Sequence, residues 1–308
     1  MANISAGMVK DLREKTGAGM MDCKAALAET SGNVEAAVDW LRKKGISKAA
    51  KKAGRVAAEG LIGVAVRGNR GALVEVNSET DFVARNDTFK AFAKEAAGLA
   101  LAANGDVDRL LSSKTASGST VEESLTNMIA KIGENMSIRR AAVLEVEPGI
   151  VVAYVHNAAA PELGRIGVLV ALRSSAPPEK IAPLAKQLAM HIAFAAPQAL
   201  TAEQLPEEVV ARERAIHGEL ARQSGKPENV IEKMIEGRMR KFYEEAVLLS
   251  QIFAIDNETQ IAKVVERASK DAGAPMEIAG FLRFAVGEGI ERPDAGDFAG
   301  EVKAMAGR

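Results

Sequence analysis

Three short segments at the start of the chain place their apolar residues at helical spacing. Ser5 is suited to cap the first segment, and Asn33 is suited to cap the third, which Gly45 is expected to end. The second segment covers about residues 21–29. The apolar faces of the first and third segments are Met8, Val9 and Leu12, and Val34, Ala37, Val38 and Leu41. Residues 1–54 are therefore predicted to form a three-helix unit, which buries little surface and is expected to dock on another body.

Residues 55–148 combine strand patterns with helical ones. The predicted elements are strands at about 58–67 and 71–78, helices at about 81–103 and 120–134, and a strand near 138–147. A Gly-Asn-Arg turn joins the first two strands into a hairpin. This order predicts one α+β unit with an antiparallel sheet.

Residues 149–202 and 247–290 repeat that order. The predicted elements are strands at about 150–156 and 165–173, helices at about 178–195 and 259–272, and a strand near 277–286. Residues 157–164, which include Pro161, are predicted to be a loop. Because hairpin and helix recur in the same order, the sequence predicts a core of two similar α+β subdomains, each with its own antiparallel sheet.

Residues 203–246 carry no strand pattern and interrupt the second unit. Pro206 and Pro227 suit the first turns of two helices joined by a short Ser-Gly-Lys turn. Narrow apolar stripes follow each proline: Val209, Ile216 and Leu220, then Ile231, Met234, Ile235 and Phe242. The prediction is an inserted antiparallel helical hairpin, or coiled coil, that projects from the second subdomain. Residues 291–308 are predicted to contain a short C-terminal helix.

Composition narrows the classes of function. With 26% charged residues and a formal net charge of −1, the chain as a whole is not suited to bind a polyanion. An aromatic content of 4% argues against stacking on single-stranded bases. The single cysteine, Cys23, excludes an internal disulfide and fits a reducing compartment. Without a signal-peptide pattern or an apolar run long enough for a bilayer, we expect a cytoplasmic protein that binds no membrane.

A basic run covers residues 42–55, which hold seven lysines and arginines and no acidic residue. One interpretation is a patch that binds nucleic acid. The other is a solvated helix between two domains, which is favoured because alanines separate the charges and no aromatic residue is present.

Motifs for catalysis or nucleotide binding are missing from the sequence. Gly225-Lys226 is followed by Pro227, where a phosphate loop needs Ser or Thr. No pair of histidines has the spacing of a metal site; the three are His156, His191 and His217. A small-molecule hydrolase that uses Glu79, Asp81 and His156 stays open as an alternative, although carboxylates near a helix start are more often caps. We therefore expect no enzyme activity, no cofactor and no metal.

The segment Thr80-Asp81-Phe82-Val83 joins a predicted strand to a predicted helix. Thr80 and Asp81 lie where a helix cap is expected, so Phe82 and Val83 form an apolar pair at the helix start. Phe82 can fold back on its own helix as a hydrophobic staple. Alternatively, the loop can present Phe82 and the Asp81 carboxylate to a partner.

The stretch from Glu75 to Asp87 resembles the signature of the elongation factor Ts family, the guanine-nucleotide exchange factors of the translation GTPase elongation factor Tu. Further stretches resemble the family in the same order along nearly the whole chain: Thr16–Lys24, Lys51–Gly54, Ile132–Arg140, Gly225–Pro227, Glu236–Lys241, Phe281–Phe284 and Gly287–Gly289. Agreement of several separate stretches argues against chance.

This resemblance implies a translation elongation factor that binds GDP-bound and nucleotide-free elongation factor Tu and promotes GDP release, so that GTP can rebind. It assigns this work to Thr80, Asp81, Phe82 and Val83. Phe82 is expected to wedge between helices of the GTPase domain, and Asp81 is expected to disturb the network around the Mg²⁺ ion of elongation factor Tu.

The resemblance also implies that residues 1–54 are similar to a ubiquitin-associated domain that contacts elongation factor Tu, partly through Met20 and Met21. These methionines could instead fill the core of the small unit. His156 matches a family residue that acts on the phosphate-binding side of the partner. The loop predicted after His156, however, is longer than the short turn of the family.

Two further parts have family counterparts. The hairpin of residues 203–246 resembles a coiled-coil or dimerisation module, which leaves open a homodimer in a two-to-two complex with elongation factor Tu. Residues 291–308 resemble a C-terminal module that packs on the same partner. The resemblance implies no direct binding of nucleotide or nucleic acid.

Overall fold

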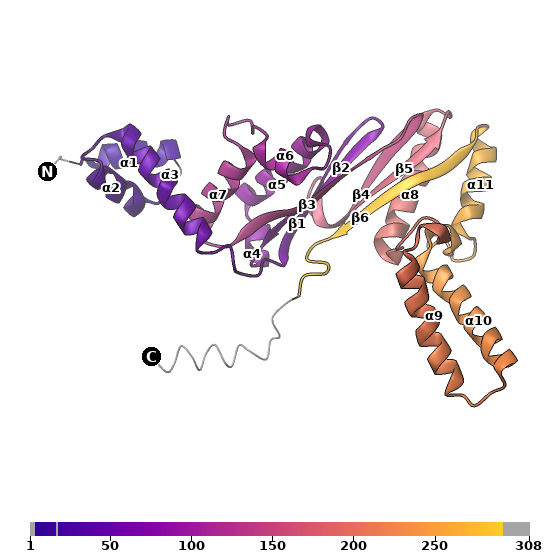
Figure 1. The fold of residues 1–308 in the computed structure, drawn as a ribbon. Coiled ribbons are helices and arrows are strands. Elements are labelled where there is room, and N and C mark those ends of the chain that lie inside the picture. The colour runs from indigo at the N-terminus through magenta and orange to yellow at the C-terminus, as the bar shows by residue number, and fades with distance from the viewer. Residues whose placement is uncertain (1–3, 17, 292–308) are drawn as a thin grey trace.

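The computed structural model describes residues 4–16 and 18–291 and shows an elongated α+β protein (Figure 1). A helical bundle lies at one end, an antiparallel sheet covered by helices lies in the middle, and a helical hairpin projects from the other end (Figure 1). The helix predicted near the C-terminus lies outside the described residues. No helix within the described ranges is long and apolar enough to cross a membrane.

The N-terminal bundle has its own small core. Its helices are α1 (Ala6–Thr16), α2 (Met20–Glu29) and α3 (Val34–Ala50). Ser5 Oγ accepts a hydrogen bond from the backbone N–H of Met8 at 3.2 Å, and Asn33 Oδ1 accepts one from Ala36 at 3.0 Å, so both predicted caps are confirmed. The buried residues between the helices are Val9, Leu12, Cys23, Ala26, Leu27 and Ala37.

The predicted end of α3 at Gly45 is wrong, because the helix continues to Ala50. Gly45 is buried where α3 packs on α7 (Val121–Ile132), and a Cβ at this position would lie 3.5 Å from the Cβ of Ala130. Gly45 therefore lies within a contact between two helices and does not end one of them. The basic run begins inside this continuous helix, which connects the bundle to the middle of the molecule (Figure 1).

The first half of the middle region contains three antiparallel strands and four helices. Its elements are β1 (Glu59–Arg67), β2 (Arg70–Ser78), α4 (Asp81–Ala84), α5 (Asp87–Ala103), α6 (Val107–Ser112), α7 and β3 (Met136–Glu145). The helix predicted over 81–103 is divided in two, because Asn86 Oδ1 accepts hydrogen bonds from the N–H groups of Thr88 and Phe89 (2.9 and 3.4 Å) and caps a new helix. The sequence pattern does not predict α6.

The second half has the predicted strand and helix order. Its elements are β4 (Gly149–Ala160), β5 (Leu163–Ser174), α8 (Pro178–Ala195), α11 (Ile261–Ala272) and β6 (Met276–Ala285). Helix α8 begins and ends where the sequence predicts, and it shares a core with α11 and the strands. The loop predicted over 157–164 is wrong, since Pro161 and Glu162 alone separate β4 from β5. The Asn-Ala-Ala-Ala-Pro run lacks the β-branched residues by which strands are recognised.

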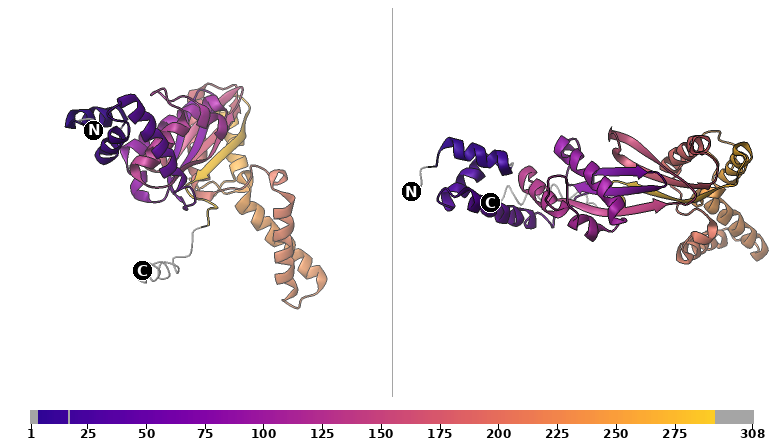
Figure 2. Two further views of the ribbon diagram at one scale, coloured as in Figure 1. Left: turned by 60° about the vertical axis from the view of Figure 1, so that its left-hand side comes forward. Right: turned by 90° about the horizontal axis from the view of Figure 1, so that it is seen from above.

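The described strands form one hydrogen-bonded sheet, which corrects the prediction of two separate sheets. The strand order is β3-β2-β1-β5-β4, and β6 pairs with β5. Strands β1 and β5 pair at Ile62–Gly164 and Gly63–Leu163, and beyond this corner the two halves pack face to face. A Cβ on Gly167 would lie 2.6 Å from Cγ2 of Ile62, so this close approach requires glycine. Helices cover the outer face of each half (Figure 2).

The hairpin consists of α9 (Glu207–Arg222) and α10 (Glu228–Ala246), with short 3₁₀ turns at Ala202–Gln204 and Leu248–Ser250 on either side. It extends away from the sheet in all three views (Figures 1 and 2). Pro206 and Pro227 lie immediately before the first helical residues, so they open the helices as predicted, from the N-cap position.

The apolar stripe predicted on α9 is wrong in part. Ile216 and Leu220 are 43% and 58% exposed, and the buried residues of α9 are Gly218 and Ala221. A Cβ on Gly218 would lie 3.6 Å from Cδ1 of Ile235, an ordinary contact distance, so this side of α9 faces α10. The stripe of larger residues consequently faces away from α10.

Candidate functional site

The two apolar residues of the Thr80–Val83 segment face opposite ways. Val83 is 5% exposed and belongs to the core that β1, β2 and α5 share, whereas Phe82 is 75% exposed. Phe82 does not fold back on its helix, so the hydrophobic-staple interpretation is wrong. Burial of this side chain against another surface would be worth roughly 1.5–3 kcal/mol.

Asp81 is the first residue of α4, where the helix dipole favours a negative charge. Its carboxylate forms an ion pair with Arg85 one turn later at 2.7 Å, and the Asp81 side chain is 45% exposed. Because both partners are largely solvated, this pair stabilises the fold little. The Asp81 carboxylate can therefore exchange Arg85 for another charge at low cost.

Thr80 occupies the N-cap position of α4, but its side chain makes no capping hydrogen bond. The hydroxyl donates instead to Oε1 of Glu134 at 2.7 Å, and the backbone N–H of Thr80 donates to Oε2 of the same carboxylate at 3.0 Å. Glu134 lies between α7 and β3, so this contact joins two segments that are far apart in the sequence. Of the segment predicted from the sequence, Thr80 is thus an anchor, and Asp81 and Phe82 are the side chains presented to solvent.

A buried carboxylate at Glu75 holds the strands behind this loop. Glu75 is fully buried on β2 and accepts hydrogen bonds from Arg139 (3.2 Å) and Arg140 (2.5 Å), and from the backbone N–H of Gly287 (2.8 Å). It therefore links β2 and β3 to the segment after β6. Sequence reasoning missed this role, although an acidic residue in an apolar strand and two adjacent arginines later in the chain are the signal that could have indicated it.

Met20 and Met21 lie at the start of α2 and are 48% and 76% exposed. They do not belong to the core of the bundle, so the interpretation that they fill that core is wrong. Flexible, exposed methionines are common on surfaces that bind partners.

His156 lies on β4 and is exposed. Its Nδ1 is 3.1 Å from the Tyr154 hydroxyl, and the Lys186 ammonium lies 5.4 Å from the centre of the Tyr154 ring. The segment after His156 is strand rather than a long loop, with a bulge between Ala158 and Ala160. The long loop predicted after His156 was the feature that differed from the family at this position. Because the structure has strand there, that difference is removed.

The residues proposed for hydrolysis are each used in separate contacts. Glu79 accepts from the backbone N–H of Asn135, Asp81 pairs with Arg85, and His156 bonds Tyr154. Among the described residues, no group of three or more His, Cys, Asp or Glu side chains could hold a metal ion. The hydrolase alternative thus gains no support.

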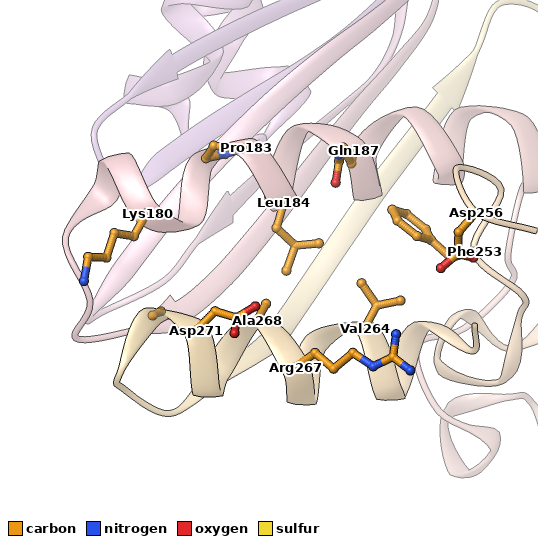
Figure 3. Close-up of a pocket in the computed structure, with 11 residues that line it drawn as sticks. Lys180, Pro183, Leu184, Gln187, Phe253, Asp256, Val264, Arg267, Ala268 and Asp271 are labelled. Atoms are coloured by element: carbon orange, nitrogen blue, oxygen red, sulfur yellow. The ribbon is translucent and has the colours of Figure 1, made fainter. Parts of the chain in front are cut away.

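A groove lies between α8 and α11, in the second half of the middle region (Figure 3). Pro183, Leu184, Phe253 and Val264 form its apolar part, and charged side chains of both signs stand at its rim. Asp256, on the rim, has a lowered pKa because the backbone N–H groups of Glu258 and Thr259 donate to its carboxylate. No histidine, cysteine or serine is among the residues that line the groove.

Four of the seven basic residues of the 42–55 run are paired within the protein. Arg42 contacts Glu123, Lys44 and Lys48 contact Asp22 (3.1 and 2.9 Å), and Arg55 contacts Glu79 (3.5 Å). Hydrogen bonding to Lys48 holds the pKa of Asp22 below its usual value, and burial opposes this shift. These pairs favour the linker interpretation over a nucleic-acid patch.

Phe82 is an exposed aromatic side chain on an anchored loop, and aromatic residues are enriched in the surfaces by which proteins bind other proteins. The family model "Elongation factor TS" matches residues 79–288. The chain is 59% identical over 307 residues to the elongation factor Ts of Rhodospirillum rubrum, with 99% of each chain covered. It is 58% identical to that of Rhodospirillum centenum and 56% to that of Maricaulis maris, with full coverage of each. The chain belongs to the elongation factor Ts family, a family of translation elongation factors.

Proposed function

We propose that this protein promotes the release of GDP from elongation factor Tu, so that GTP can bind in its place. The observation that carries the proposal is Phe82, which is 75% exposed on a loop that is anchored at both ends. The role needs no active site, because a protein that binds the nucleotide-free state of its partner more tightly than the GDP-bound state weakens GDP binding by the same factor.

Phe82 inserts between helices of the GTPase domain in this proposal, and its burial there stabilises the nucleotide-free state. Asp81 acts beside it on the side chains and waters around the partner's Mg²⁺ ion. A carboxylate suits this task because a divalent cation organises that network. The exposed Arg85 pair leaves the Asp81 carboxylate accessible for the exchange.

Other parts of the molecule add contacts with the same partner. Met20 and Met21 extend the contact from the bundle of residues 1–54, which serves as a ubiquitin-associated-like domain. His156 acts from the second half of the core, on the phosphate-binding side. We assign no nucleotide, nucleic-acid or membrane binding to the chain itself.

The domain organisation that fits this role places one core subdomain at 55–148 and the other at 149–202 and 247–290. The hairpin of residues 203–246 is the module through which two copies can associate in a two-to-two complex with elongation factor Tu. Residues 291–308 form a C-terminal module that contacts the same partner. The place of action is the cytoplasm, where translation occurs.

Release of labelled GDP from elongation factor Tu, followed with and without this protein, tests the proposal. We expect strong acceleration, and no binding of GDP to this protein alone by calorimetry. The Asp81→Ala variant should slow release mainly when Mg²⁺ is present and should act nearly as wild type in chelator. An unaccelerated release, or tight GDP binding by the isolated chain, would contradict the proposal.

A further inference from the structure

The ladder between β2 and β3 ends at the pair Ser78–Met136, just before the exposed loop. Two carboxylates replace backbone carbonyls as acceptors beyond that point. Glu134 accepts from the N–H of Thr80 at 3.0 Å, and Glu79 accepts from the N–H of Asn135 at 2.5 Å. Each carboxylate thus binds the residue that follows the other one, and the two segments are held together past the end of the sheet.

Glu134 holds Thr80 by two bonds, since its second oxygen accepts from the Thr80 hydroxyl at 2.7 Å. Hydrogen bonds to a charged acceptor are short and stronger than neutral ones, and a pair of them fixes direction as well as distance. Thr80 immediately precedes Asp81 and Phe82. The orientation of both exposed side chains therefore depends on this carboxylate.

Helix α4 cannot provide that orientation by itself. It has four residues, which is one turn, and an isolated turn does not form stably in water. On its C-terminal side the turn is fixed by the burial of Val83 and Ala84. On its N-terminal side the fixed point is Thr80, and Ser78 adds a hydrogen bond from its hydroxyl to the Thr80 carbonyl at 2.9 Å.

We propose that Glu134 is a positioning residue, whose carboxylate holds Thr80 so that Asp81 and Phe82 stand in the orientation in which they act on the partner. The inference rests on the proposed function. It assigns to the segment between α7 and β3 a part in exchange that does not require Glu134 to touch elongation factor Tu.

A double-mutant cycle on GDP release from elongation factor Tu tests this role. Glu134→Ala should lower the maximal stimulated rate about tenfold, because a small misplacement of an acting group is costly. If Glu134 acts through Asp81 and Phe82, adding Glu134→Ala to the double variant Asp81→Ala/Phe82→Ala should cause no further loss. Glu122→Ala, an exposed glutamate on α7 without a contact to the loop, is the matched control and should be normal.

The outcomes separate the two proposals. If Phe82→Ala slows release but Glu134→Ala is as fast as wild type, or Glu134→Ala keeps its full loss in the Asp81→Ala/Phe82→Ala background, the positioning role is wrong and the proposed function stands. If Phe82→Ala itself is as fast as wild type, the proposed function of the loop fails and the positioning role fails with it.

Hydrogen exchange of the free protein gives an independent measurement. The Thr80 amide should exchange faster in Glu134→Ala, while amides within α5 keep their protection. Thr80→Ser retains both bonds to Glu134 and should release GDP at nearly the wild-type rate, whereas Thr80→Val loses one bond and should be slower. Unchanged exchange at Thr80 in Glu134→Ala would overturn the inference even if the variant were less stable overall.

Discussion

The Thr80–Val83 loop and the α9–α10 hairpin both expose large apolar side chains, but they hold them in different ways. Phe82 is 75% exposed on a single turn that is tied to the α7–β3 segment and to the sheet core. Leu220 is 58% exposed on a helix that packs on α10 and projects from the body (Figure 1). Exposed apolar residues are normal on a two-helix hairpin, which has little surface to cover them. Phe82 differs because the residue two positions before it, Thr80, is fixed by hydrogen bonds to a distant segment. An exposed side chain on such a fixed loop indicates a binding site.

The largest effect on the free energy of unfolding should come from replacing Phe89, seven residues after Phe82, by alanine. Phe89 is fully buried in the core of the first half, so Phe89→Ala should lower the free energy of unfolding by about 3–5 kcal/mol. Phe82→Ala should change it by less than about 0.5 kcal/mol. Urea unfolding of both variants measures this contrast. If Phe82→Ala is destabilised as much as Phe89→Ala, Phe82 is a core residue and the comparison fails.

Acid should weaken the base of the hairpin before it affects the loop. His191 is buried, its Nε2 lies 2.8 Å from Gln251 Oε1, and its Nδ1 accepts from the N–H of Ala254 at 3.2 Å. Gln251 in turn donates to the Glu245 carbonyl at the end of α10. Protonation of Nδ1 would break the Ala254 bond.

Burial lowers the pKa of His191 below its unfolded value, and the bond to Gln251 opposes the shift. The unfolded state then binds more protons, so stability from this group is complete above the unfolded pKa of about 6.5 and is lost as pH falls toward the folded pKa. Thermal melting between pH 7.5 and pH 5 should show this loss in the wild type and less of it in His191→Asn. Equal pH dependence in both proteins would show that protonation of His191 does not cause the loss of stability.

The smallest effect should come from the exposed stripe of the hairpin. Ile216→Ala with Leu220→Ala should change the free energy of unfolding by less than about 0.5 kcal/mol per site, because neither side chain is packed in the single chain. Chemical denaturation at low protein concentration measures this. A larger loss that grows with protein concentration would show that the stripe is buried between two copies, through the proposed association of hairpins.

The sequence predicted local structure well wherever one pattern decided it. The β1–β2 hairpin and α8 follow from alternation, glycine turns and helical spacing over 58–78 and 178–195. It did not predict the joining of the two sheets, because the β1–β5 contact links Gly63 to Leu163 and no local signal marks such a pair. The prediction at Gly45 was wrong because a glycine that ends a helix and one that lies within a helix–helix contact look alike in the sequence.

The candidate site shows the same division. The residue types at positions 80–83 indicated that this loop is the candidate site. That Phe82 is exposed while Val83 is buried could be learned only from the fold. Glu134 was missed because its partner, Thr80, lies 54 residues away in the sequence, and such a contact leaves no spacing signal.

The most direct test compares two exposed apolar residues in one assay. Release of labelled GDP from elongation factor Tu is measured at saturating wild-type protein, Phe82→Ala and Leu220→Ala. Loss of the burial of one Phe side chain predicts that Phe82→Ala slows stimulated release by about 10- to 100-fold, while Leu220→Ala matches the wild type. Normal release with Phe82→Ala, at a temperature where the variant is folded, would contradict the account.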